Sequence, residues 1–172
     1  MTYKPGDVAL YTGENKFAIA IKFGNWWTRM FGDKRGVNCT HVGIMVGPNK
    51  IVEALSTGVT GRDIETKGLI GVYRLDDLSA GDEETLKEEA LDQVGEKYSQ
   101  TINIIIGVMK FFHAEKMFKG VGYKGKNCSI VVGKCFDSIG YDLRKDECTD
   151  LLDPGDIAEH ILSSNNWTEV TK

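Results

Sequence analysis

Short apolar runs separated by turns rich in Gly, Pro and Asp follow one another through the first half of the chain, a pattern that predicts β-strands. Asp7–Tyr11 follows a Pro-Gly turn and predicts the first strand. The runs Val42–Val46 and Ile51–Ala54 flank the turn sequence Gly47-Pro48-Asn49-Lys50 and predict a hairpin. Further strands are expected near Gly58–Arg62 and at Leu69–Leu75.

Apolar residues recur at helical spacing in the other segments. Ser79 and Asp82 are suited to cap a helix whose buried stripe is predicted to be Leu86, Ala90, Leu91, Val94 and Tyr98. Further helices are expected at Asn15–Phe31, at Thr101–Phe112, at Ser129–Ile139, and from Pro154 through Leu162. The pattern predicts one α+β domain over residues 1–172, with a central antiparallel sheet packed by helices.

Composition narrows the class of protein. The chain has 172 residues, of which 41% are hydrophobic and 27% charged, as in ordinary soluble globular proteins. A formal charge of −4 argues against a dedicated nucleic-acid binder. The most apolar stretch, Ile102–Met109, is far shorter than the roughly 20 residues that span a bilayer. With no visible secretory signal, we expect a cytoplasmic protein, although a processed exported form would look the same.

Four cysteines occur, at positions 39, 128, 135 and 148. A domain of this size does not need disulfides, and the spacings do not match a paired zinc motif. Free thiols, at least one of them reactive, are therefore the favoured interpretation. No metal or organic cofactor is expected.

Cys128 has the local sequence of a thiol nucleophile. It follows the basic segment Lys124–Asn127 and precedes the apolar run Ile130–Val132. If that run opens a helix, the helix dipole favours a thiolate at Cys128, and backbone N–H groups are available to an oxyanion. The alternative is a buried, unreactive cysteine, which is the usual state of a free thiol.

His41 begins the first strand of the predicted hairpin, and Glu53 lies in its second strand. A tight hairpin that pairs Val46 with Ile51 would place Glu53 opposite Ile44, on the other face from His41. A register shifted by one residue, through a three-residue turn or a bulge, would place both on one face. Glu53 has apolar neighbours, so it either faces solvent or holds the imidazole.

Three sequence segments, "GDVALY", "THVGIMVGPNKIVEA" and "NCSIVV", together resemble the YiiX-like permuted papain-fold proteins, relatives of the NlpC-type cell-wall peptidases. In the NlpC type the cysteine precedes the histidine, whereas here it follows, as in the circularly permuted branch. The resemblance implies that Cys128 is the nucleophile, His41 the general base and Glu53 the orienting residue. The related lecithin retinol acyltransferase-like enzymes tend to have a second histidine where this chain has Glu53, which favours the hydrolases.

Three functions from different classes follow from these residues. The first is a cysteine hydrolase that cleaves an amide or ester bond, with cell-wall peptide as the substrate that the resemblance implies. The second is a lipid acyltransferase, and the third is an inactive binding module on the same fold. The substrate would be a peptide, small molecule or lipid, with membrane contact suggested only by the lysines and aromatic residues between Lys110 and Lys126.

Other residues compete for a role. Cys39 shares a strand face with His41 if the chain is extended there, and is a weaker candidate nucleophile because no helix N-terminus accompanies it. His113 and His160 are interpreted as surface or packing residues. The alternative interpretation of the lysines before Cys128 is a solvated surface with core aromatics between them.

Overall fold

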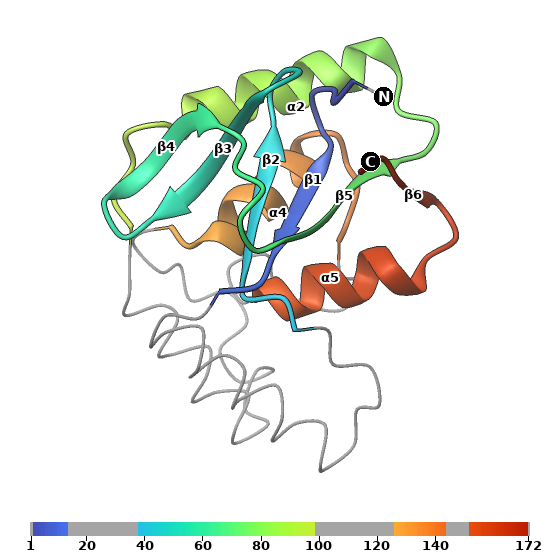
Figure 1. Ribbon diagram of the computed structural model, residues 1–172. Coiled ribbons are helices and arrows are strands. Elements are labelled where there is room, and N and C mark those ends of the chain that lie inside the picture. Colours follow the sequence, from blue (N-terminus) through green and yellow to red (C-terminus); the bar gives the residue numbers. More distant parts are fainter. Residues whose placement is uncertain (1, 14–37, 99–125, 144–151, 172) are drawn as a thin grey trace, which may run out of the picture.

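The computed structural model describes residues 2–13, 38–98, 126–143 and 152–171 (Figure 1). In these ranges the chain forms one sheet and three helices. The strands are β1 (Val8–Tyr11), β2 (His41–Met45), β3 (Lys50–Leu55), β4 (Gly58–Asp63), β5 (Leu69–Leu75) and β6 (Trp167–Glu169). The helices are α2 (Ala80–Asp92), α4 (Cys128–Ser138) and α5 (Pro154–Ser163).

The sheet has six strands in the order β4-β3-β2-β1-β5-β6, and every neighbouring pair is antiparallel. The prediction of an α+β fold with a central antiparallel sheet is therefore confirmed for the described ranges, as are all five predicted strands. β6 was not predicted, because three residues are too few to show a period. It completes the sheet by pairing Trp167 with Leu75.

Alternation along the central strands gives the sheet two apolar faces. One face packs against all three helices through a cluster that includes Leu10, Ile44, Leu86, Val131, Phe136 and Ile157. In Figure 1, α4 lies behind the sheet, α2 runs along the top of the view and α5 lies below. The other face carries a smaller cluster of Ala9, Tyr11, Met45, Ile51, Val72 and Val170. By register the His41 side chain leaves β2 on this second face, but His41 is the first residue of the strand and therefore lies at the end of the sheet.

Helix α2 buries a narrower stripe than predicted. Leu86 and Ala90 are fully buried, but Leu91 and Val94 are 46% and 43% exposed, which corrects the prediction for these two residues. The helix ends at Asp92 and is capped by Gln93, so the helical period no longer applies further along. Only the side of α2 that meets α4 and the sheet is covered.

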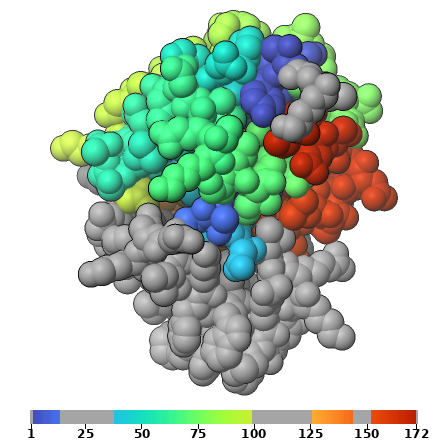
Figure 2. Space-filling view, in the orientation of Figure 1, coloured from blue at the N-terminus to red at the C-terminus, as the bar shows by residue number. Residues whose placement is uncertain are grey.

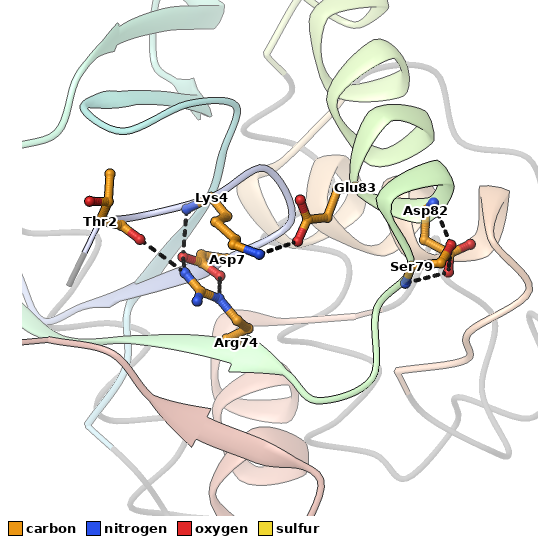
Figure 3. A network of polar contacts seen from close by, with 7 residues as sticks. All are labelled: Thr2, Lys4, Asp7, Arg74, Ser79, Asp82 and Glu83. Atoms are coloured by element: carbon orange, nitrogen blue, oxygen red, sulfur yellow. Dashed lines mark hydrogen bonds and ion pairs between the residues drawn. The ribbon is translucent and has the colours of Figure 1, made fainter.

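The start of the chain is held by a network around the buried Asp7 carboxylate (Figure 3). Arg74 donates to both carboxylate oxygens, from Nε and Nη2, each at 2.7 Å, and the Lys4 backbone N–H donates at 2.8 Å. The Lys4 ammonium forms an ion pair with Glu83 of α2 at 2.9 Å. These contacts join β1, β5 and α2 at the edge of the molecule where N-terminal and C-terminal residues lie side by side (Figure 2).

The predicted helices at Asn15–Phe31 and Thr101–Phe112 lie outside the described residues. The other two predicted helices are observed as α4 and α5 with ends within about one residue of expectation. Among the helices of the described ranges, none combines the length and the apolar character needed to cross a membrane.

Candidate active site

The hairpin of β2 and β3 places His41 and Glu53 on the same face of the sheet. The Val46 N–H donates to the Lys50 carbonyl at 2.9 Å, so residues 47–49 form a three-residue turn. This is the register shifted by one residue from the tight hairpin. It confirms the prediction that such a shift would bring the two side chains to one face.

Glu53 is fully buried and contacts the imidazole directly. The His41 Nε2–H donates to Glu53 Oε2 at 2.5 Å, while the His41 side chain remains 25% exposed. The register, continued along the hairpin, sets Gly43 opposite Glu53. A Cβ at Gly43 would lie only 3.2 Å from the Glu53 Cβ and 2.7 Å from Ile51 Cδ1. Because Gly43 has no side chain, the Glu53 carboxylate can extend across β2 and reach the imidazole.

Arg62 of β4 is the second partner of Glu53. Its Nε donates to Glu53 Oε1, and its Nη1 donates to Glu65 Oε1. A buried carboxylate without a partner would be costly, and here each of its oxygens has one. Burial favours the neutral acid, but the hydrogen bonds from His41 and Arg62 outweigh this effect, so the pKa of Glu53 lies below its ordinary value.

Cys128 is the first residue of α4, as the sequence predicted. Asn127 caps the helix, since its side chain accepts the N–H of Ile130 at 2.7 Å. The His41 ring and the Val42 backbone lie close enough to the Cys128 sulfur to stabilise its thiolate. Because Nε2 of that ring contacts Glu53, Nδ1 is the ring nitrogen that remains for the thiol.

The thiol and the imidazole shift each other's proton affinities. Burial raises the pKa of Cys128, but the His41 charge and the hydrogen bonds to the sulfur outweigh this effect and lower it. Burial likewise opposes the imidazolium, but the Cys128 thiolate and Glu53 raise the pKa of His41 to about 10. Both shifts favour a thiolate–imidazolium pair over the neutral thiol and imidazole.

Tyr11 lies beside the imidazole, with the two ring centroids 5.9 Å apart. Its side chain is buried, and its hydroxyl has no hydrogen-bond partner in the part of the chain that the structure describes. Burial, with the Glu53 charge nearby, raises the pKa of this phenol. Tyr11 is therefore a neutral wall of the site at neutral pH.

The other described thiols differ from Cys128. Cys39 donates to the backbone carbonyl of His41 at 3.3 Å rather than to its ring. Cys135 lies 3.4 Å from the Gln93 amide. Burial raises the pKa of both thiols to about 12, which keeps them protonated at neutral pH. All three are free cysteines, and Cys148 lies outside the described residues.

Lys126 does not have the solvated position considered for the lysines before Cys128. It is buried, donates to Gln93 Oε1 at 3.0 Å and pairs with Glu96 at 3.3 Å. Burial and the nearby Lys134 lower the pKa of its ammonium. The other four lysines of this segment, its aromatic residues and His113 lie outside the described residues. His160 contacts the Tyr141 hydroxyl at 3.0 Å, consistent with a packing role.

Arg62 and Tyr11 were not identified as site residues from the sequence. Arg62 lies in a strand that was predicted, and an arginine near a strand with an isolated glutamate is a recognisable signal. To place Arg62 beside Glu53, however, one must know the register between β3 and β4, in which Ile51 pairs with Arg62. To place Tyr11 beside the imidazole, one must know that Tyr11 pairs with His41.

The described residues contain no group of three or more His, Cys, Asp or Glu side chains arranged to hold a metal ion. No protein-family model matches the sequence, and no curated protein matches it.

Proposed function

We propose that the protein is a cysteine hydrolase that cleaves an amide or ester bond through a thioacyl-enzyme, with Cys128 as nucleophile, His41 as general acid–base and Glu53 as the residue that orients it. The observation that supports this most is the contrast among the thiols. Cys39 and Cys135 are buried and have a raised pKa, whereas Cys128 is also buried and has a lowered one. A merely structural cysteine has no need of a helix N-terminus and an imidazole.

The reaction follows from the charges of the pair. The Cys128 thiolate attacks the substrate carbonyl carbon, a C–S bond forms, and the carbonyl π electrons move to the oxygen. The first N–H groups of α4 precede any intrahelical bond and are suited to donate to this oxyanion. As the oxyanion collapses, the C–N or C–O bond breaks and His41 gives its proton to the leaving group.

Water completes the cycle. Neutral His41 takes a proton from water as the hydroxide attacks the thioester carbonyl, and the sulfur then leaves as a thiolate. The imidazolium that results is stabilised by Glu53, at 2.5 Å from Nε2. The thiolate–imidazolium pair is thereby restored.

We also propose that the α+β fold is a circularly permuted, NlpC-type papain-like domain. In support, the histidine and its carboxylate lie on adjacent strands early in the chain, and the cysteine that opens a helix against that sheet comes later. An NlpC-type enzyme has the same parts with the cysteine first. The resemblance also makes a cell-wall peptide the first substrate to test.

Of the two alternatives, the lipid acyltransferase relied on a basic, aromatic rim before Cys128. Lys126 is the described lysine of that segment, and it is buried against Gln93 and Glu96. It therefore lends no support to a rim that attracts anionic lipid. The inactive module predicts an ordinary thiol at Cys128, with alkylation rising only around pH 8.5.

The test is a pH profile of iodoacetamide alkylation, read for each cysteine by peptide mass spectrometry. We expect Cys128 to react well below pH 8.5, and Cys128→Ala to lose this reactivity while Cys135→Ala retains it. A Cys128 profile that rises only around pH 8.5 would rule out the hydrolase. Incubation with cell-wall peptide fragments and with acylated lipids, followed by product analysis, then separates hydrolysis from acyl transfer.

A further inference from the structure

Four charged side chains of alternating sign form a row on one face of the sheet. The row runs from His41 on β2 through Glu53 on β3 to Arg62 on β4, and ends at Glu65. From Glu53 outward the exposure of these side chains increases: Glu53 is fully buried, Arg62 is 30% exposed and Glu65 is 60% exposed. The candidate active site is therefore connected to the surface by ion pairs.

The sheet register explains how the arginine reaches the carboxylate. Arg62 pairs with Ile51 across β3 and β4, so it lies diagonally beside Glu53 on the same face. The Arg62 Nε–H donates to Glu53 Oε1, and this leaves Oε2 to accept from the imidazole. The two carboxylate oxygens are thus divided between two cations, and the arginine determines which oxygen faces His41.

We propose that Arg62 is a positioning residue of this site, which holds Glu53 toward His41 and limits how tightly the His41–Glu53 pair holds its proton. The inference rests on the proposed function, because it assigns Arg62 a task in the same proton transfer. An imidazolium that faces an unshared carboxylate would hold its proton more strongly. It would then be a weaker acid toward a leaving group. By sharing the carboxylate, Arg62 keeps that proton transferable.

The proposal predicts a direction that simple loosening of the site does not. Removal of a nearby cation raises the pKa of every neighbouring group, so both the Cys128 and the His41 transitions should move to higher pH. The shift should be larger for His41, because Arg62 contacts its partner directly. Loosening would instead return each group toward its ordinary value, with Cys128 rising to about 8.5 and His41 falling to about 6.5.

The experiment compares Arg62→Gln with a matched control, Arg74→Gln. Arg74 also pairs with a buried carboxylate, that of Asp7, and its side chain is 25% exposed, close to the 30% of Arg62 (Figure 3). The Cys128 transition is measured by alkylation, and the His41 transition by NMR of its ring C–H signals. Circular dichroism at each pH verifies that the protein is folded.

For Arg62→Gln we expect the His41 transition to rise by about one pH unit, and the Cys128 transition to rise by less. Arg62→Lys keeps the charge, so both transitions should lie close to their wild-type positions, and Arg74→Gln should leave both transitions in place. Unshifted or converging transitions in Arg62→Gln would overturn the proposal.

If Arg62→Gln does not fold, the Arg62→Lys variant tests the proposal. A Cys128 transition that rises and a His41 transition that falls in Arg62→Lys would exclude the positioning role of Arg62. A wild-type Cys128 with an ordinary transition would instead refute the proposed function, and that result is read before any variant is made.

Discussion

The Glu53 carboxylate shows how one buried charge sets the behaviour of its neighbours. It has no exposed surface, yet it remains ionised because His41 and Arg62 each take one of its oxygens. The raised pKa of His41, about 10, depends in turn on the negative charges of Glu53 and of the Cys128 thiolate. At this site a single side chain therefore links the acid–base chemistry to the packing of the sheet.

Replacement of Glu53 by Gln should lower the pH at which His41 loses its proton. The amide retains an oxygen that accepts from Nε2 but brings no negative charge, so the imidazolium loses a stabilising partner. We expect the His41 transition to fall from about 10 by one unit or more in an NMR titration.

Asp7→Asn is the matched control for this variant. It neutralises another buried carboxylate that pairs with an arginine, Arg74, at a separate place in the sheet. An equal fall in both variants would show that the effect is not specific to Glu53.

At the scale of elements, the site depends on one hairpin and one helix end. The three-residue turn sets the register of β2 and β3, and Gly43 leaves the space through which Glu53 reaches His41. The Asn127 cap holds the first turn of α4, where Cys128 lies. Small changes in either element should therefore be visible in the reactivity of the thiol.

Gly43→Ala should destabilise the protein and separate Glu53 from His41. The added methyl would lie 2.7 Å from Ile51 Cδ1 and 3.2 Å from the Glu53 Cβ, closer than normal packing allows. We expect a loss of about 1–3 kcal/mol in urea unfolding, together with an alkylation transition of Cys128 at higher pH.

Gly61→Ala provides a control on β4, where the new methyl meets only Val52 Cγ2, at 3.9 Å. It should change stability by less than about 1 kcal/mol and leave the Cys128 transition unchanged. If the two glycine variants behaved alike, close packing at Gly43 would not explain the geometry of the site.

Two substitutions at Asn127 separate its effect as a helix cap from the effect of a charge placed beside the Cys128 thiolate. Asn127→Ala removes the acceptor for the Ile130 N–H and should cost about 1 kcal/mol of stability. Asn127→Asp keeps the cap but adds a negative charge beside the thiolate, so stability should be retained while the Cys128 transition moves to higher pH. Urea unfolding and alkylation of both variants test this, and an unshifted transition in Asn127→Asp would contradict it.

At the scale of the whole molecule, the sequence predicted the strands and helices of the described ranges well, but it did not determine the register between neighbouring strands. The runs Val42–Val46 and Leu69–Leu75 have clear apolar periods, and both were found as strands. The contact between His41 and Glu53 was predicted only for one of two registers, because turn length was not known. The pairing of Ile51 with Arg62 depends on a second turn, so the role of Arg62 was not visible.

The remaining differences have local physical causes. The predicted stripe of α2 continued past Asp92, but Leu91 faces solvent because neither α4 nor the sheet covers that side. Lys126, grouped by sequence with solvated lysines, is buried because Gln93 and Glu96 supply its partners. These partners of the buried Lys126 ammonium depend on how α2 and α4 pack together, and a local sequence pattern does not predict that packing.

The reactive form of Cys128 should disappear in the same transition as the sheet. The thiol lies on α4 and its partner His41 on β2, so their pairing exists only while the helix packs on that strand. Alkylation of Cys128 at pH 6 and far-UV circular dichroism should therefore give coincident urea midpoints. Rapid alkylation that persists beyond the loss of the dichroism signal would show that the thiol is activated locally.

The order of the parts along the chain has a consequence during synthesis. The ribosome makes His41, Glu53 and Arg62 first, and the cysteine that opens α4 emerges only afterwards. In the proposed mechanism, a product cut short before α4 carries His41, Glu53 and the Cys39 thiol but lacks Cys128, and a full-length chain that has not folded carries a Cys128 of ordinary reactivity. If Cys128 is the nucleophile, as proposed, acyl transfer begins only after the whole chain has been made and folded.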